Sequence, residues 1–176
     1  EYGVTIPQGI GFIAKRLPEI LEDAENALPE VFRQLLQRLG DHLKELARQV
    51  GELEVQIQTW HRENHMSKKL AMIPGIGPIT ASALVASIGD AKNFKDGRQL
   101  AAWLGLVPRQ NSSGGKQTLL GISKRGDIYL RTLLIHGARA VIRVAERKAN
   151  HADSWLAHLM VRRNKNVATV ALANKN

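Results

Sequence analysis

The chain has 176 residues, no cysteine, 44% hydrophobic residues and a formal net charge of +9. This composition excludes a disulfide framework and a thiolate metal site, and it fits a reducing compartment. No apolar run reaches the roughly 18 residues of a membrane span, so we expect no membrane partner and a cytoplasmic location. The chain begins at Glu1 rather than at a methionine, so we expect it to be a piece of a longer protein.

The charge is divided unevenly along the chain. Residues 1–66 carry 11 acidic and 7 basic side chains, a net charge of −4, whereas residues 67–176 carry 5 acidic and 18 basic side chains, a net charge of +13. A basic segment of this density is typical of nucleic-acid binding, although the same charge also serves plain solubility. We therefore expect two domains, residues 1–66 and residues 67–176, of which the second contacts nucleic acid.

A heptad pattern predicts a long helix from about Pro29 to Asn64, extending about 50 Å. The apolar positions follow one another in alternating steps of four and three residues; they are Phe32, Leu36, Leu39, Leu43, Leu46, Val50, Leu53, Ile57 and Trp60. Such a seam is typical of a coiled coil. Its partner is either a second copy of the chain, which would give a homo-oligomer, or the apolar stripe between Leu17 and Leu28. We expect Pro18 to start that preceding segment and Pro29 to end it.

Residues 70–85 read Leu-Ala-Met-Ile-Pro-Gly-Ile-Gly-Pro-Ile-Thr-Ala-Ser-Ala-Leu-Val, which is the pattern of a helix-hairpin-helix. Pro74 ends the first helix near Ile73, and Gly75 and Gly77 permit positive φ in the turn. The second helix begins with free N–H groups and a positive dipole end, which suit a phosphate. The alternative is an ordinary tight turn, or a hairpin that only braces its protein neighbours. The predicted backbone contacts are Gly75, Ile76, Gly77 and Thr80.

The remaining segments are predicted as helices around one long polar loop, residues 105–122. Asp96 is the predicted N-cap of a helix that ends at Leu104, with Leu100, Trp103 and Leu104 on its inner face. Further helices are expected from about Asp127 to Lys148, from Ser154 to Arg163, and from Asn166 onward. No segment alternates like a strand, so the predicted fold class is all-α. It comprises a long coiled-coil helical arm followed by a compact helical domain that contains the helix-hairpin-helix.

The polar loop places two hydroxyls, two glycines and a cation together, in Ser112-Ser113-Gly114-Gly115-Lys116. A hydroxyl among cations can attack a phosphodiester, because the cations stabilise the charge that develops on phosphorus. The same residues can also bind phosphate without chemistry, or form a plain flexible loop. Four arginines spaced 8, 4 and 4 residues apart, from Arg131 to Arg147, are expected to share one helix face. The predicted nucleic-acid-binding cations are Lys116, Lys124, Arg125, Arg131, Arg139 and Arg143.

The sequence predicts no metal site in this chain. His61 and His65 are four residues apart, but no acidic third ligand stands at a suitable spacing. The aspartates of the basic half are not grouped in a way that would hold two metal ions; they are Asp90, Asp96, Asp127 and Asp153.

Four stretches within residues 70–145 resemble, in order and spacing, the C-terminal half of one group of bacterial transposases. They are Ile73-Pro-Gly-Ile-Gly-Pro, Phe94 to Arg109 with Trp103-Leu104-Gly105-Leu106, the loop from Ser112 to Lys116, and Ile122-Ser123-Lys124-Arg125-Gly126. The group consists of the bridge-RNA-guided insertion-sequence transposases, known as the IS-one-ten and IS-eleven-eleven group. Such proteins combine a RuvC-like domain bearing four metal-binding carboxylates with a coiled coil and a C-terminal transposase domain.

The resemblance implies a DNA recombinase whose attacking serine maps to Ser113, the serine directly before glycine, with Ser112 as the runner-up. Strand exchange would pass through a covalent 5′-phosphoserine link. The RuvC-like domain is absent from these residues, so we expect Mg²⁺ only with that domain, no cofactor in this chain, and no recombination by this fragment alone. A guide RNA is the expected partner of the full-length protein.

Two other functions remain open at this point. The chain can be a non-enzymatic nucleic-acid-binding module with a coiled-coil oligomerisation arm, in which the serine loop only holds phosphate. It can also be an oligomerisation element, although the basic half argues against that interpretation.

Overall fold

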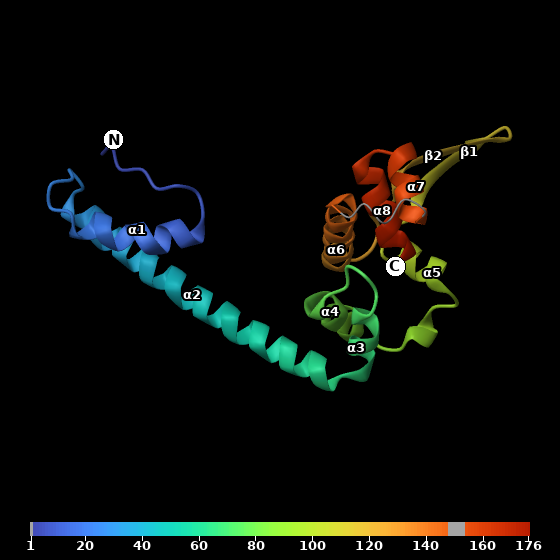
Figure 1. Cartoon of the computed structure of the whole chain (residues 1–176), viewed down its shortest axis with the longest axis horizontal. Helices are drawn as coiled ribbons and strands as arrows, with labels where there is room; N and C mark the ends of the chain where they lie inside the picture. The colour runs from blue at the N-terminus through green and yellow to red at the C-terminus, as the bar shows by residue number, and fades with distance from the viewer. Residues whose placement is uncertain (1, 148–153) are drawn as a thin grey trace. The chain divides into compact units, whose positions relative to one another are not determined.

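A computed structural model describes residues 2–147 and 154–176 of the chain. It separates into two compact units, Glu1–Gln56 and Ile57–Asn176, and the boundary falls within the long helix α2. The elements, labelled in Figure 1, are α1 (Ile10–Glu22), α2 (Glu30–Glu63), α3 (His65–Ala71), α4 (Pro78–Ile88), the 3₁₀ helix η1 (Ala91–Asn93), α5 (Gly97–Trp103), β1 (Pro108–Ser113), β2 (Lys116–Ile122), α6 (Ile128–Arg147), α7 (Trp155–Arg162) and α8 (Lys165–Lys175).

The predicted all-α fold class is wrong, because the segment predicted as a polar loop folds into a β-hairpin. Strands β1 and β2 pair antiparallel, and they form the one sheet among the described residues. Helices nevertheless dominate the rest of the described chain, and those expected around residues 29–64, 96–104, 154–163 and 166 onward are present with small shifts of their ends. The predicted helix from Asp127 to Lys148 is α6, and its last predicted residue lies outside the described residues.

The first unit places α1 against the amino-terminal part of α2. Leu17 and Ile20 are the buried apolar side chains of α1. A Cβ built on Gly40 would lie 2.6 Å from a methyl carbon of Leu17, so the absence of a side chain at Gly40 lets the two helices approach. Pro18 lies inside α1 rather than at the start of the segment, which corrects the prediction.

Arg33 holds the connection between α1 and α2 together. Its guanidinium donates hydrogen bonds to the carbonyl oxygens of Leu21 and Asp23, both at 2.8 Å, and to that of Leu28 at 3.2 Å. The last carbonyl groups of a helix have no partner within the helix. One side chain from α2 therefore caps α1 and fixes the short segment that follows it.

The predicted long helix is confirmed as α2, but its heptad seam is largely open to solvent. Leu39, Val50 and Leu53 are 54–57% exposed, and Leu46 is 44% exposed. The seam positions next to α1 are better covered, since Leu36 and Leu43 are half-buried. The contact with α1 thus covers only part of the seam, and the coiled-coil partner expected for the remainder stays a prediction. Among the helices in the described residues, none has the length and apolar character needed to cross a membrane.

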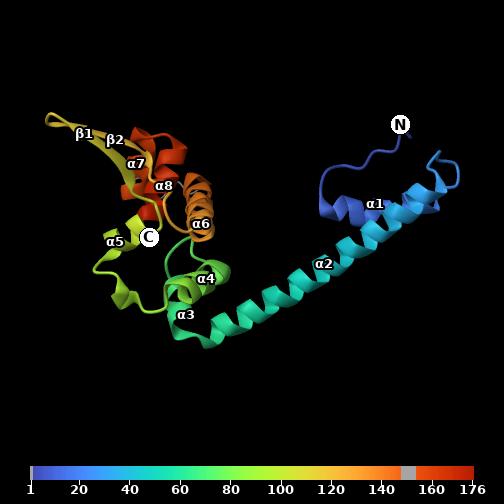
Figure 2. The same cartoon turned by 180° about the vertical axis from the view of Figure 1, so that it is seen from behind.

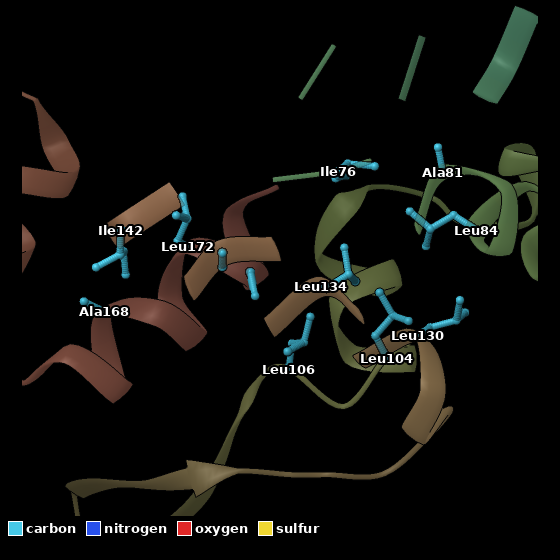
Figure 3. Packing of buried hydrophobic residues seen from close by; sticks show 12 residues of the cluster. Ile76, Ala81, Leu84, Leu104, Leu106, Leu130, Leu134, Ile142, Ala168 and Leu172 are labelled. Carbon is cyan, nitrogen blue, oxygen red and sulfur yellow. The ribbon is translucent and has the colours of Figure 1, made fainter. Parts of the chain in front are cut away.

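The second unit has a hydrophobic core built around α6. Figure 3 shows side chains from α4, α6 and α8 meeting those of the segment after α5. The buried apolar residues are Ile76, Ala81, Leu84, Leu104, Leu106, Leu130, Leu134, Ala138, Ile142, Ala168, Leu172 and Ala173. On α6 the buried positions recur every four residues from Leu130 to Ile142, which is the spacing of one helix face.

Helix α5 begins as predicted, because the Asp96 side chain accepts a hydrogen bond from the backbone N–H of Gln99. Its inner face differs from the prediction. Leu104 is buried, but Trp103 is 41% exposed and packs edge-on against Phe94 with 5.6 Å between ring centroids. Ala101 takes the buried position instead.

Candidate nucleic-acid interface and serine hairpin

Helices α3 and α4 are joined by a tight turn at the predicted place. The turn is closed by two backbone hydrogen bonds of 3.0 Å, from Ile73 N–H to the Leu70 carbonyl and from Ile76 N–H to the Ile73 carbonyl. Gly75 has a φ of 91°, a conformation that favours glycine. Gly77 has a φ of −90° and is the N-cap of α4, so it does not adopt the positive φ that glycine permits there.

The turn packs against α6 through glycines. A Cβ on Gly75 would lie 2.8 Å from the carbonyl oxygen of Gly137, and a Cβ on Gly137 would lie 1.9 Å from the carbonyl oxygen of Gly75. Gly75 is therefore explained by contact with the protein itself. Gly137 could not be singled out from the sequence, because a lone glycine within a helical pattern carries no sign of its distant neighbour.

Two of the four residues predicted to touch a nucleic-acid backbone in this turn have buried side chains. Ile76 is 5% exposed and Thr80 is 7% exposed, so both belong to the interior. Gly77 is exposed, and a Cβ at this position would meet no atom within 4 Å. Between the buried Ile76 and Thr80, a ligand can reach the exposed amino end of α4, from Gly77 to Ile79.

Ser113 lies at the tip of the β-hairpin, which extends away from the helices of its unit (Figures 1 and 2). Ser113 pairs with Lys116 across a two-residue turn formed by Gly114 and Gly115, and Ser112 pairs with Gln117. Both glycines have positive φ, 56° and 81°, as two-residue hairpin turns of the I′ type require. All described residues from Pro108 to Gly121 are exposed. The tip therefore presents its side chains to solvent.

The pairing separates the two serines. Directly opposite residues of an antiparallel pair point to the same face, and successive residues of a strand point to opposite faces. Lys116 therefore shares a face with Ser113, and Ser112 lies on the other face with Gln117. Of the two candidate hydroxyls, the one of Ser113 is accompanied by a cation.

The other predicted cations do not surround the serine. Five residue steps of about 3.3 Å separate Ser113 from the base of β1, so the tip stands roughly 17 Å from the base. Lys124 and Arg125 follow the base of the hairpin, where the Lys124 N–H donates to the Gly105 carbonyl at 3.1 Å. A Cβ on Gly105 would lie 1.9 Å from the Arg125 carbonyl oxygen, so these backbones are in contact.

Arg131 is 8% exposed, and its guanidinium serves the protein interior. It donates a 3.0 Å hydrogen bond to the carbonyl oxygen of Leu104, at the end of α5. At about 100° per residue, the eight-residue step to Arg139 turns the helix by about 80°. The prediction that Arg131 shares a face with Arg139, Arg143 and Arg147 is therefore wrong. Arg139 is half-buried, and Arg143 and Arg147 are exposed.

Among the described residues, no group of three or more His, Asp or Glu side chains lies close enough together to hold a metal ion. His61 Nδ1 instead lies 2.6 Å from Oγ of the buried Ser67. The aspartates Asp90, Asp96 and Asp127 accept hydrogen bonds from backbone N–H groups at the starts of helical segments. Asp153 lies outside the described residues.

Comparison with known proteins identifies the segment that carries these features. Residues 67–153 match the sequence model described as the transposase IS116/IS110/IS902 family. The chain is 55% identical over 177 residues to a probable family 20 transposase of Pseudomonas aeruginosa, covering 100% of this chain and 52% of that protein.

Two further relatives are named after insertion sequences. The transposase for insertion sequence element IS1111A of Coxiella burnetii is 43% identical over 176 residues, covering 100% of this chain and 48% of the relative. The transposase for IS1328 of Yersinia enterocolitica is 42% identical over 175 residues, covering 99% and 52%. The chain spans about half the length of the curated relatives it matches.

Proposed function

We propose that this chain is the part of a transposase that binds DNA and supplies a nucleophilic serine, because residues 67–153 match the IS116/IS110/IS902 transposase family model. The observation that carries the proposal is the position of Ser113. Its hydroxyl stands at the exposed tip of a hairpin, with Lys116 on the same face. A projecting hydroxyl can reach a phosphodiester that the compact part of the unit cannot.

The proposed step is a transesterification. Ser113 Oγ forms a bond to phosphorus while the bond from phosphorus to the 3′ oxygen breaks. The hydroxyl proton passes to water, and the departing 3′ oxygen takes up a proton. The product is a 5′-phosphoserine link, from which a 3′ hydroxyl of another strand can later displace the serine. Lys116 is placed to stabilise negative charge on the phosphate.

The metal that the resemblance implies has no matching donor set in the described residues, so no step of this proposal passes through it. We place the metal-binding carboxylates of the RuvC-like domain outside these 176 residues, and recombination then requires the longer protein. The proposal also includes a guide RNA for that longer protein, and a cytoplasmic location, where bacterial DNA lies.

The test uses a full-length transposase that contains these residues, supplied with metal, guide RNA and a nicked DNA substrate that traps the intermediate. Ser113→Ala should abolish the protein–DNA adduct on a denaturing gel while DNA binding persists, and the matched control Ser112→Ala should retain the adduct. Stability should change by less than about 0.5 kcal/mol, because the side chain is exposed. An adduct mapped by mass spectrometry to Ser112 would assign Ser112, rather than Ser113, as the nucleophile. Undiminished recombination by the Ser112→Ala/Ser113→Ala double variant would refute a serine nucleophile.

We also propose that the exposed seam of α2 pairs with a second copy of the chain. Leu46→Lys and Leu53→Lys together place charges in the seam without touching the contact between α1 and α2, since both side chains are exposed. Light scattering should show a shift from oligomer to monomer. A wild-type chain that is already monomeric at high concentration would contradict this part of the proposal.

A non-enzymatic DNA-binding module is the second candidate. It is favoured by the distance of about 17 Å between Ser113 and the cations at the base of the hairpin. In that case the hairpin only holds a phosphate, and the adduct experiment separates the two candidates.

A further inference from the structure

Five exposed cations stand on the last two turns of α6 and around the connection between α7 and α8, two places that the ion pair between Lys165 and Glu146 joins. This cationic patch consists of Arg143, Arg147, Arg162, Arg163 and Lys165. Three of its members lie beyond residue 153, where the match to the transposase family ends. None of those three belongs to the turn, the hairpin or the interior described above.

An ion pair between α6 and α8 holds the patch together. Lys165 Nζ lies 2.7 Å from a carboxylate oxygen of Glu146, and both side chains are 41–49% exposed. Arg143 lies one helical turn before Glu146 on the same side of α6, and Arg163 lies two residues before Lys165. Side chains three or four positions apart in a helix have Cβ atoms about 5–6 Å apart. The ion pair therefore brings the end of α6, with Arg143 and Arg147, next to the start of α8, which Arg162 and Arg163 precede.

Local hydrogen bonds define how the chain enters and leaves this area. The Arg162 Nε donates to the His158 carbonyl at 3.2 Å, and the Arg163 N–H donates to the Leu159 carbonyl at 2.9 Å. Asn164 then caps α8 by accepting a 3.0 Å hydrogen bond from Val167 N–H. Arg162 thus ends α7, and Arg163 stands on the ordered turn that leads to α8.

The acidic counterpart of the patch is small. In the described parts of α6 to α8, Glu146 is the sole side-chain carboxylate, and it is already paired with Lys165. Five cations against one carboxylate leave a net charge of +4 on the patch. Positive charge of this density on one face is the electrostatic footprint of a nucleic-acid backbone.

We infer that the cationic patch is a second DNA-binding surface, which contacts backbone phosphates of duplex DNA away from the α3–α4 turn. Nine residues separate Glu146 from Gly137, so the two lie about 14 Å apart along α6 and, at about 100° per residue, on opposite sides of it. Gly137 is the residue that touches the turn. This inference rests on the proposed DNA-binding function and extends it to residues outside the family match.

The inference makes Glu146 an internal competitor for Lys165. A phosphate and the Glu146 carboxylate require the same ammonium group, so neutralising Glu146 should free one more cation for DNA. An exposed ion pair contributes little to stability, so the fold should survive its loss. Substitution of Glu146 therefore offers a gain of binding, which a merely damaged variant does not show.

The experiment measures binding of the whole chain to a random-sequence DNA duplex at several salt concentrations. The slope of log affinity against log salt changes by roughly 0.9 for each phosphate contact. Arg162→Gln with Arg163→Gln should make the slope shallower by roughly 1 to 2, whereas Glu146→Gln should raise the affinity and steepen the slope by roughly 1. Matched controls with equal charge changes in the first unit are Arg38→Gln with Lys44→Gln, and Glu54→Gln.

The outcomes separate this inference from the proposed function. If the wild-type chain binds the duplex, and the patch variants behave like their matched controls, the inference is overturned while DNA binding stands. If the wild-type chain shows no salt-dependent binding to the duplex, DNA binding by this chain fails, and the inference fails with it.

Discussion

Two pairs of glycines in the second unit exist for opposite reasons. Gly75 and Gly137 bring two backbones into contact, and a Cβ on Gly137 would lie 1.9 Å from the Gly75 carbonyl oxygen. Gly114 and Gly115 touch nothing, since a Cβ on either would meet no atom within 4 Å, but both require positive φ. The first pair is needed for packing and the second for the shape of a turn.

The difference distinguishes a rigid scaffold, the helical core around α6, from an arm, the β-hairpin of β1 and β2. Leu134 and Ala138, on either side of Gly137, are buried on α6, whereas the hairpin around Gly114 is exposed along nearly its whole length. An isolated two-stranded hairpin is marginally stable in water. Its function is therefore expected to depend on what it contacts, while the function of the core is to hold the hairpin and the basic surfaces in place.

The largest effect is expected for Gly137→Ala. The new methyl group would collide with backbone atoms that cannot move aside easily, so unfolding of the second unit should become easier by about 3 kcal/mol or more. All three tryptophans lie within Ile57–Asn176, so tryptophan fluorescence during urea unfolding reports this unit. Gly51→Ala is the matched control, because its Cβ meets open space in α2 and lies in the first unit, so the unfolding of the second unit should stay unchanged. Wild-type stability of Gly137→Ala would refute the packing argument.

A smaller and local effect is expected for Gly115→Ala. A residue with a Cβ at a φ of 81° has a conformational free-energy cost of about 1–2 kcal/mol. This cost should destabilise the hairpin and leave the core unaffected. Nuclear magnetic resonance should show loss of the cross-strand contacts between Ser113 and Lys116, while urea unfolding of the core stays unchanged. Gly114→Asn should keep the hairpin, because asparagine tolerates a φ of 56°. A drop in core stability comparable to that of Gly137→Ala would contradict the separation of arm and scaffold.

The smallest effect is expected for Gly77→Ala at the exposed N-cap of α4. The backbone there is extended and the space is open, so the loss of stability should stay below about 1 kcal/mol. If a DNA phosphate approaches this helix end, the added methyl group should weaken binding roughly two- to fivefold, in line with the usual energy of such contacts. Unchanged affinity in a filter-binding titration would favour the alternative in which the turn only braces its protein neighbours.

Several helices were predictable from sequence because they have strong local signals, whereas α1 lacks a side-chain N-cap and its start was misplaced. The four-and-three spacing predicted α2, and Asp96, Ser154 and Asn164 occupy N-cap positions that suit their side chains. The contacts between helices were not predictable in the same way. The contact between Gly75 and Gly137 joins residues far apart in the chain. The sequence around one glycine does not indicate that the other lies against it.

The hairpin was not predicted because a strand is usually identified by the alternating apolar and polar residues that a buried face produces. β1 and β2 have almost no buried face, so their sequences show no alternation of apolar and polar residues. A signal was nevertheless present in Gly114-Gly115, since two glycines between extended segments favour a two-residue hairpin turn. Interpreting these glycines only as flexibility led to the wrong fold class.

The candidate site was predicted in its residue types but not in its arrangement. The sequence indicated a serine among cations, yet the hairpin separates Ser113 from Lys124 and Arg125, and Arg131 is buried. Ser113 is close to Lys124 and Arg125 in sequence, which suggested that they are close in space. An extended strand pair instead holds the tip of the hairpin far from its base. The basic character of the segment was evident from composition, whereas the patch near Lys165 depends on how α6, α7 and α8 pack.

Hydrogen exchange of the whole chain, with and without duplex DNA, tests most directly whether the hairpin is the arm that meets DNA. Without DNA, amides from Pro108 to Ile122 should exchange rapidly, and those on the buried face of α6 should exchange slowly. Added DNA should slow exchange in the hairpin and leave the buried face of α6 unchanged. Tight DNA binding with no change of exchange in the hairpin would contradict the account.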